Sequence, residues 1–353
     1  MSGGAGQIAE WREVDTATFR DRIYSTNQPA VLRGIVRHWP AVQRGSASAQ
    51  AMCDYLLSLP QGTPVPLLTA DASVKGRLFF RDDMQGPNFQ RRAVPLAAGL
   101  QALLAHLDDP APPAVFVESA LLSSCLPTFA LGNRLDLLDE SVVPAGDSLA
   151  NRSVAPRIWI GNAVKIQTHY DFSNNIACVL AGRRRFTLFP PEQLPNVYPA
   201  PLDITLAGVP VSMVPLQNPD FERYPRFRQA LAAAKVIELE AGDALFIPYG
   251  WWHHVESLLP FNVLVNYWWT DSAPLTSPAD CLLHGVLALR DLPAAERAVW
   301  RNLFDYYVFQ TSGDPLAHLD PGMRGLMGGS GPEEFRRMKA ILLRSLGHRH
   351  GEK

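Results

Sequence analysis

The sequence lacks the features that mark secreted, membrane-spanning or disulfide-rich proteins. Its opening segment, MSGGAGQIAEW, has no basic stretch followed by an apolar run, so no signal peptide is expected. No apolar stretch reaches the roughly 18 residues that a membrane-spanning helix requires. Only four cysteines are present, and no two of them form a CxxC pair. Scattered cysteines of this kind are typical of reduced thiols, which predicts a cytoplasmic protein.

An excess of charge of one sign is also missing. The chain carries 32 Lys and Arg residues against 34 Asp and Glu residues, a formal net charge of −2. This balance gives no electrostatic basis for binding nucleic acid or an anionic membrane. Hydrophobic residues make up 47% of the 353 positions, enough for a large core in one catalytic domain with an appendage or in two ordinary domains.

Residues 1–113 predict a flanking region of mixed α and β structure. Capping and turn signals predict helices over 16–24, 47–57 and 95–107 and a strand over 29–33. From residue 114 to residue 272 the pattern changes to short β runs separated by turns. These runs cover 114–119, 157–161, 165–180, 184–189, 235–239, 244–248, 253–257 and 262–269. Roughly eight antiparallel strands predict a mainly β fold, built as a two-sheet jelly roll or barrel.

The C-terminal segment 273–353 has a different, helical period. Apolar residues recur every three to four positions over 279–289, 294–309 and 333–346. Helices that follow a β core form either a packed cap or an oligomerisation element, and the sequence alone leaves both open.

The tripeptide His169-Tyr170-Asp171 is the strongest candidate for part of a metal site. Residues two apart on a strand share a face, so His169 and Asp171 could bind one ion from a single strand. The segment PYGWWHHVES then supplies His253 from a neighbouring strand. Two imidazoles and one carboxylate on one side of an ion are typical of non-haem iron(II) oxygenases. The alternative is that HxD and HH are chance pairs without a ligand.

Strand parity distinguishes His253 from His254. Val255 shares the face of His253, and Glu256 shares that of His254. The apolar neighbour favours His253 as the inward ligand, which makes His254 and Glu256 a surface pair or a pair behind the ligands. We also expect Gly242-Asp243 to form a hairpin turn, and Trp251-Trp252 to provide an apolar wall beside the imidazole.

The run GRRRFTLF contains a candidate anion-binding residue. On a strand, Arg184 would share a face with Phe186 and Leu188, whereas Arg183 and Arg185 would point the other way. A guanidinium on an apolar face is costly unless it meets an anion, such as the carboxylate of a cosubstrate. The alternative is a structural ion pair with one of the acidic residues.

These motifs together resemble a known family, the cupin-like JmjC-domain 2-oxoglutarate oxygenases, and in particular its asparaginyl hydroxylases. The resemblance covers roughly residues 13–270, including the Trp39-Pro40 segment. It is carried, in the family's order, by QTHYDFSNN, GRRRFTLFPPEQ, FERYPRF, GDALFIPYGWWHHVESLL and VNYWW.

The resemblance implies a double-stranded β-helix core with defined site residues. His169, Asp171 and His253 look like the iron ligands. Arg184 stands where the family has a lysine that pairs with the far carboxylate of 2-oxoglutarate. The other pocket positions are two asparagines, an aromatic, and two sites where the relatives carry a threonine and a tyrosine: Asn175, Asn266, Trp268, Ile166 and Phe116.

The same resemblance implies an activity and an assembly. It predicts an iron(II)- and 2-oxoglutarate-dependent dioxygenase that uses O2, hydroxylates a protein side chain or a small molecule, and releases succinate and CO2. It also predicts a homodimer formed through the C-terminal helices. The remaining alternatives are a metal-binding cupin without 2-oxoglutarate (an isomerase or a cosubstrate-free dioxygenase) and a non-catalytic sensor. The loops 121–152 and 199–227, which are expected to choose the substrate, contain no recognisable motif.

Overall fold

The computed structural model describes residues 6–81, 83–138, 142, 154–202, 205–206, 208–271, 276–328 and 331–347. The chain divides into two compact units, Met1–Asp271 and Ser272–Lys353. The candidate loops 121–152 and 199–227 lie partly outside the described residues.

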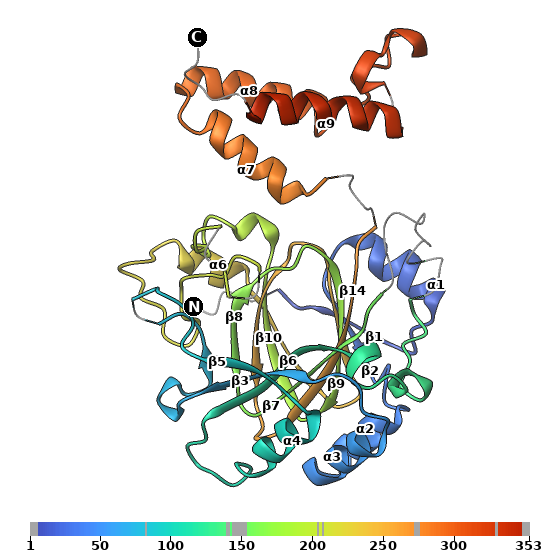
Figure 1. Cartoon of the computed structure of the whole chain (residues 1–353), viewed down its shortest axis with the longest axis vertical. Helices are drawn as coiled ribbons and strands as arrows, with labels where there is room; N and C mark the ends of the chain where they lie inside the picture. Colours follow the sequence, from blue (N-terminus) through green and yellow to red (C-terminus); the bar gives the residue numbers. More distant parts are fainter. Residues whose placement is uncertain are drawn as a thin grey trace. The chain divides into compact units, whose positions relative to one another are not determined.

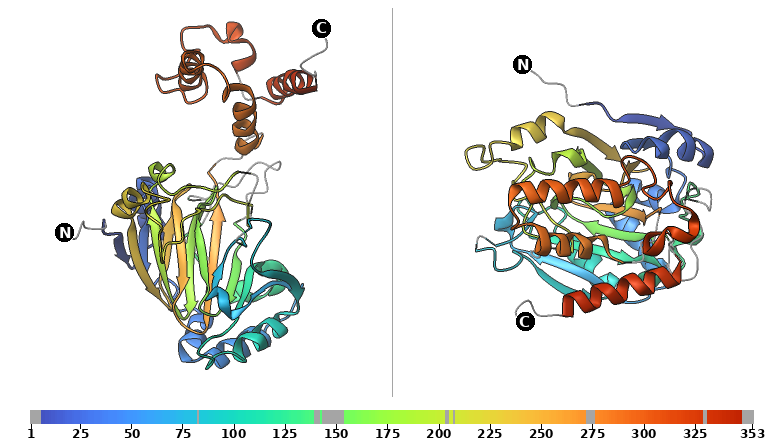
Figure 2. Two further views of the ribbon diagram at one scale, coloured as in Figure 1. Left: turned by 90° about the vertical axis from the view of Figure 1, so that its left-hand side faces the viewer. Right: turned by 90° about the horizontal axis from the view of Figure 1, so that it is seen from above.

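The first unit is built on two β-sheets that face each other (Figures 1 and 2). The larger sheet has the strand order β1-β2-β12-β9-β14-β7-β6-β3-β5. Its strands are β1 (Ala9–Arg12), β2 (Ala30–Arg33), β3 (Val65–Ala70), β5 (Gln90–Val94), β6 (Ala114–Leu121), β7 (Arg157–Gly161), β9 (Asn174–Ala181), β12 (Ala244–Ile247) and β14 (Asn262–Trp269). The smaller sheet has the order β11-β10-β13-β8-β4. Its strands are β4 (Arg77–Leu78), β8 (Lys165–His169), β10 (Arg183–Phe189), β11 (Lys235–Glu240) and β13 (Trp252–Ser257).

An apolar core fills part of the space between the two sheets. Val179, Leu245 and Leu264 of the larger sheet form one buried cluster with Phe186 and Leu239 of the smaller sheet. Each of these residues sits on the inward face of its strand, as the two-residue period of a β-strand requires. The predicted jelly-roll fold is therefore confirmed.

Three helices cover the outer face of the larger sheet: α2 (Pro40–Ala47), α3 (Ala49–Ser58) and α4 (Leu96–Leu104). The helix predicted over 47–57 is in fact α3, and α2 precedes it. Gly45 lies inside α2, and a Cβ there would come within 2.2 Å of the carbonyl oxygen of Leu180 on β9. The glycine that weakens the helical pattern is therefore what allows α2 to lie directly on the sheet.

Shorter helices complete this unit. They are α1 (Thr16–Thr18), which continues as a π turn over Phe19–Ile23 and a 3₁₀ turn over Tyr24–Thr26, α5 (Leu122–Cys125) and α6 (Phe227–Ala233). Further 3₁₀ turns cover Ala72–Val74, Phe129–Leu131 and Pro191–Gln193. Asp15 caps α1 by accepting a hydrogen bond from the backbone N–H of Thr18.

Two expectations about the strands are corrected. The run 165–180 is not one strand but two, β8 and β9, which belong to different sheets. Gly242-Asp243 does not close a hairpin, because β11 pairs with β10 whereas β12 pairs with β9 and β2. Gly242 has φ +101°, and the turn carries the chain from the smaller sheet to the larger one.

The second unit is helical in its described residues. It contains α7 (Pro278–Leu289), α8 (Ala294–Tyr307) and α9 (Pro332–Gly347), with 3₁₀ turns over Pro321–Met323 and Gly325–Met327. Many large apolar side chains of these helices are exposed, among them Leu283, Leu287, Trp300 and Leu343. Among the helices in the described parts of the chain, none combines the length and the apolar character needed to cross a membrane.

Candidate metal centre and its pocket

Three side chains converge at one end of the space between the sheets. His169 is the last residue of β8, Asp171 lies in the turn after it, and His253 is the second residue of β13. His169 and His253 face each other across the two paired strands, with ring centroids 4.2 Å apart. One possible ligand atom of each residue lies within 4.8 Å of the others. Their separation is suited to a single metal ion held by two imidazoles and a carboxylate.

Backbone hydrogen bonds orient both imidazoles. Nδ1 of His169 lies 2.8 Å from the carbonyl oxygen of Gln167, and Nδ1 of His253 lies 3.0 Å from that of Trp251. A carbonyl oxygen can only accept, so Nδ1 carries the proton in each neutral ring. The lone pair of Nε2 is then free to bind a metal.

The surroundings of His253 favour its neutral form. Burial and the nearby His169 together lower the pKa of His253 to about 4, although Asp171 opposes both effects. A neutral imidazole is the form that binds metals, so His253 is ready to act as a ligand at neutral pH.

Asp171 is positioned differently from the expectation. It does not share a strand with His169, because β8 ends before it. Two contacts hold the turn instead. Its backbone oxygen accepts from the N–H of Gly250 at 3.1 Å, and its Oδ2 accepts from the indole N–H of Trp268 at 3.1 Å. The loop before β13 and the strand β14 therefore fix this carboxylate.

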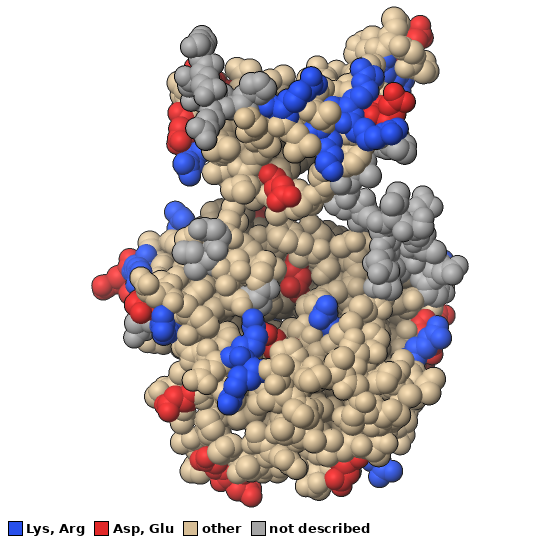
Figure 3. Space-filling view, viewed as in Figure 1, with Lys and Arg blue, Asp and Glu red and all other residues tan. Residues whose placement is uncertain are grey.

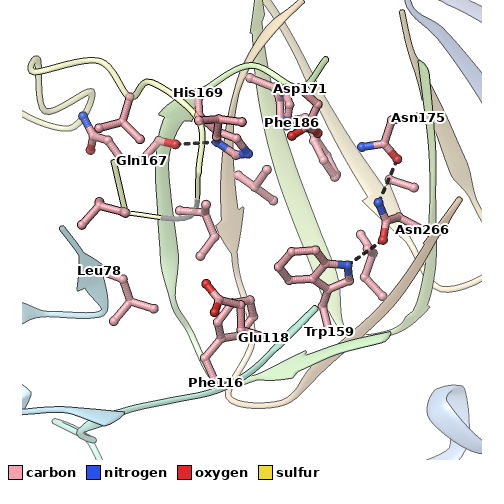
Figure 4. Close-up of a pocket in the computed structure, with 18 of the residues that line it drawn as sticks. Leu78, Phe116, Glu118, Trp159, Gln167, His169, Asp171, Asn175, Phe186 and Asn266 are labelled. Atoms are coloured by element: carbon pink, nitrogen blue, oxygen red, sulfur yellow. Dashed lines mark hydrogen bonds and ion pairs between the residues drawn. The ribbon is translucent and has the colours of Figure 1, made fainter. Parts of the chain in front are cut away.

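A cavity of about 130 Å³ opens beside the three side chains (Figure 4). All nine candidate site residues line it: Phe116, Ile166, His169, Asp171, Asn175, Arg184, His253, Asn266 and Trp268. In the space-filling view one face of the first unit is hollowed, with acidic and basic side chains close together there (Figure 3). Trp251 and Trp252 do not belong to the lining, so the expected tryptophan wall is wrong. Trp251 packs into the core between the sheets, and Trp252 packs against Phe189 on the far side of the smaller sheet.

Arg184 is the most unusual residue of the cavity. It points inward from β10, as strand parity predicted, and its side chain is 3% exposed. Its Nε and Nη2 atoms have no hydrogen-bond partner among the described residues. Burial lowers the pKa of Arg184 to about 9, so the guanidinium is still protonated at neutral pH. A buried cation without an anion is costly, and this one faces a cavity.

The neighbouring arginines confirm the division of faces on β10. Arg185 points away from the cavity and pairs with Glu238 at 2.7 Å and with Glu256 at 3.6 Å. Arg184 therefore does not make the structural ion pair that the sequence left open, at least not with any residue that the structure describes.

A chain of polar groups crosses the larger sheet inside the cavity. Asn266 donates to Oδ1 of Asn175 at 3.3 Å, and its own Oδ1 accepts from the indole N–H of Trp159 at 2.7 Å (Figure 4). The sequence predicted both asparagines but missed Trp159 on β7. Alternation puts Trp159 on the face of β7 opposite to Ile158 and Ile160, but sequence alone does not say which of the two faces lines the cavity.

Two further residues, Glu118 and His254, lie where the sequence did not predict them. Glu118 on β6 enters the cavity and was not predicted. His254 was expected at the surface or behind the ligands, and it is in fact buried. Its Nε2 lies 2.9 Å from Nε2 of Gln217, which also donates to Oε1 of Glu256 at 3.2 Å. His254 therefore supports β13 from the side away from the cavity.

Comparisons with known proteins agree with this geometry. Residues 16–274 match the family described as the cupin-like domain. The Arabidopsis thaliana protein named lysine-specific demethylase JMJ31 is 29% identical over 269 residues, 72% of this chain and 48% of the relative. The human protein named bifunctional peptidase and (3S)-lysyl hydroxylase JMJD7 is 28% identical over 265 residues, 69% of this chain and 77% of the relative. The chicken (Gallus gallus) protein named tRNA wybutosine-synthesizing protein 5 is 36% identical over 137 residues, 38% of each chain. The match thus spans about half of the plant relative's length.

Proposed function

Because the chain belongs to the cupin-like, JmjC-type domain family, we propose that it is an iron(II)- and 2-oxoglutarate-dependent dioxygenase. The reaction we propose is hydroxylation of a protein side chain or a small molecule. One oxygen atom of O2 enters the substrate, the other enters the succinate formed from 2-oxoglutarate, and CO2 leaves. The names of the human and plant relatives, a hydroxylase and a demethylase, support an oxygenase of this type.

One observation carries this proposal. An open set of two imidazoles and one carboxylate shares a cavity with a buried guanidinium that has no partner among the described residues. The first feature suits iron(II), and the second suits the far carboxylate of a bound dicarboxylate. A cupin that uses no 2-oxoglutarate would have no use for Arg184, so the cosubstrate-dependent reaction is favoured over that alternative.

Four residues would bind the metal and the cosubstrate. His169, Asp171 and His253 would hold the metal from one side through two Nε2 atoms and a carboxylate oxygen. Bound iron(II) and 2-oxoglutarate together would supply the oxidising power. Arg184 would fix the far carboxylate of the cosubstrate through paired N–H donors.

Other lining groups would orient and protect the site. Trp268 holds Asp171 in place, and Asn266 and Asn175 offer amide groups to the cosubstrate. Phe116 and Ile166, at positions where the family resemblance implies a tyrosine and a threonine, contribute apolar surface here. Phe186 and Trp159 extend that apolar wall, which would keep bulk water from the reacting atoms.

Turnover without a primary substrate tests this proposal. Incubation of the protein with iron(II), ascorbate, 2-oxoglutarate and O2 is expected to give slow succinate formation. His169→Ala should abolish it, whereas His106→Ala, a change at a partly exposed histidine outside the cavity, should not. Iron-dependent O2 consumption without succinate would favour the cosubstrate-free cupin. Equal succinate in wild type and His169→Ala would contradict the proposal.

The assembly and the location are part of the same proposal. A homodimer through α7–α9 is supported by the exposed apolar side chains of those helices. A cytoplasmic location is supported by the four cysteines, which are all free thiols.

A further inference from the structure

Apart from the histidines, the described lining of the cavity contains three side chains that can carry a charge, and Glu118 is one of them. The other two, Asp171 and Arg184, already have roles in the proposed function. Glu118 lies on β6, and Figure 4 shows it on the same side of the cavity as Phe116. The cavity walls around it are mostly apolar, including Leu68, Leu78 and Trp159. A carboxylate in such a place needs an explanation.

Glu118 shares the inward face of Phe116, two residues before it on β6, and a distortion of the strand lies beside it. The pairing of β6 with β7 shifts register between Val117 and Ala120, as a β-bulge does. Within the shift, Ser119 adopts φ +49°, a left-handed conformation that is unfavourable for a residue with a side chain. Bulges and strained residues are enriched beside active sites, where they redirect a side chain.

The bulge is tied to the candidate metal centre. Arg157 on β7 donates from Nη1 to the backbone oxygen of Ser119 at 3.0 Å. The guanidinium of Arg157 also lies 5.8 Å from the ring of Trp268, which in turn donates to Asp171. Arg157 thus links the bulge beside Glu118 to the tryptophan that holds Asp171.

Glu118 keeps one oxygen available for a ligand. Its Oε2 pairs with Arg91 of β5 at 2.7 Å, whereas its Oε1 accepts no hydrogen bond from any described residue. The Arg91 side chain is 46% exposed, against 18% for Glu118. Water therefore screens the arginine more than the carboxylate, and burial raises the pKa of Glu118 although Arg91 opposes the rise. Arg91 therefore neutralises the charge of the Glu118 carboxylate only in part.

We propose that Glu118 recognises the primary substrate by accepting a hydrogen bond from a cationic nitrogen, an ammonium or a guanidinium group. This inference rests on the proposed function. A bound metal would neutralise Asp171, and a bound cosubstrate would neutralise Arg184. Glu118 then remains as the acidic group in the cavity that can bind the primary substrate. Because charge-assisted hydrogen bonds are stronger than neutral ones, a cation gains more from Glu118 than a neutral group of the same shape.

The surroundings fit a cation on an apolar stem. The cavity shares Phe89 and Leu206 with an adjoining groove that is also lined by Phe80, Met84 and Arg91. A methylene chain could lie along these side chains while its charged end reaches Glu118. Both a side chain within a protein and a free amine have this chemistry.

Binding measurements on the full-length protein test the proposal. The probes are a short alanine-rich peptide with one central lysine, the same peptide with arginine or norleucine at that position, and free lysine. Affinities are measured by titration calorimetry without O2, in the zinc-loaded protein and in the iron(II)–2-oxoglutarate form. The wild type should bind the lysine or the arginine peptide, or free lysine, at least about tenfold more tightly than the norleucine peptide.

Two variants separate recognition from a structural ion pair. Glu118→Gln should remove the preference for the cation. Arg91→Gln, which removes the competing guanidinium, should increase that preference. A purely structural pair predicts instead that both variants lower thermal stability and leave the preference unchanged. If Glu118→Gln does not fold, the Arg91→Gln result decides, and an unchanged or lost preference there would overturn the proposal.

The remaining outcomes are also informative. Tighter binding of the lysine or arginine peptide than of free lysine identifies a protein substrate, and the reverse identifies a small amine. Equal binding of lysine, arginine and norleucine peptides by the wild type, or binding of no probe, would overturn the role of Glu118. Failure of the iron form to bind 2-oxoglutarate, with the cation preference intact in the zinc form, would count against the oxygenase and not against Glu118.

Discussion

Trp268 on the larger sheet donates its indole N–H to Oδ2 of Asp171, which follows a strand of the smaller sheet, at 3.1 Å. This bond crosses from one sheet to the other at the point where the three candidate ligands meet. Asp171 lies in a turn, outside the regular pairing of β8, so it depends on such contacts for its orientation. The orientation of Asp171 therefore depends on how the two sheets pack against each other.

Loss of this bond should weaken metal binding. Trp268→Phe keeps an aromatic ring but removes the donor, and partners of metal ligands typically contribute about 10- to 100-fold to affinity. We expect iron(II) affinity, measured by anaerobic titration, to fall by that factor. Trp159→Phe is the matched control, because its indole N–H serves Asn266 and no ligand. Equal losses in the two variants would show that general packing, not the bond to Asp171, is responsible.

Arg184→Met should separate stability from cosubstrate binding. The variant replaces a buried, unpaired cation with an apolar side chain of similar length, a type of change that can stabilise a protein by about 1–4 kcal/mol. We expect the free energy of unfolding of the metal-free protein to rise in urea titrations. We also expect 2-oxoglutarate affinity to fall by at least about 30-fold, the usual cost of losing one partner of a buried charge pair.

Arg185→Met is the control for that experiment. Arg185 lies on the opposite face of β10, pairs with Glu238, and is partly exposed. Its loss should cost no more than about 1 kcal/mol and leave cosubstrate affinity unchanged. A destabilised Arg184→Met protein that still binds 2-oxoglutarate would assign Arg184 a structural role.

Periodicity explains which parts of the site could be predicted from sequence. The two-residue period placed Arg184 and Phe186 on the inward face of the regular strand β10. It also placed His253 inward, although the pairing of β13 with β8 shifts register between His253 and Val255. The same rule misplaced Asp171, because a strand's end depends on tertiary contacts that local sequence does not encode. The same rule could have found Glu118, which lies two residues after the predicted Phe116 on β6 and lines the same cavity.

The fold class was predictable for a similar reason. Turn signals and β runs marked most strands after residue 114, where apolar alternation is clear. The strands β3 and β5 were not predicted individually. For β5, QRRAV, the reason is that it is a mostly exposed edge strand with little apolar content. The connection at Gly242 was taken for a hairpin because a tight turn looks the same whether the next strand joins the same sheet or the opposite one.

Glu118→Gln should stabilise the protein at neutral pH. Burial raises the pKa of Glu118 in the folded protein above its ordinary value, so ionisation is less favourable there than in the unfolded chain. The free energy of unfolding of the wild type therefore falls as the pH rises from the ordinary pKa of a glutamate through the raised pKa of folded Glu118. At about pH 3.5 the carboxyl is mostly protonated in both the folded and the unfolded state, so Glu118 causes no such loss there. We expect a higher melting temperature for the variant at about pH 7 and none of this gain at about pH 3.5. A less stable variant at neutral pH would show that the pair with Arg91 is a net stabilising contact.

The exposed face of α7 should govern oligomeric state. Leu283 and Leu287 are 63% and 75% exposed and lie four residues apart, so they share one face of the helix. We expect wild type to sediment as a dimer and the double variant Leu283→Glu/Leu287→Glu as a monomer. Leu131→Glu, at an exposed leucine of the first unit, should leave the dimer intact. A monomeric wild type at micromolar concentration would contradict the proposed dimer.

The central claim is that His169, Asp171 and His253 hold iron(II) in the cavity where Arg184 receives 2-oxoglutarate. The most direct test is an anaerobic titration of the metal-free protein with iron(II) and then 2-oxoglutarate, followed by visible absorption. We expect a weak charge-transfer band that appears only when both are present, is absent in His169→Ala, and requires far more 2-oxoglutarate in Arg184→Met. Tight iron binding without the band in wild type, or the same band in His169→Ala, would contradict the account.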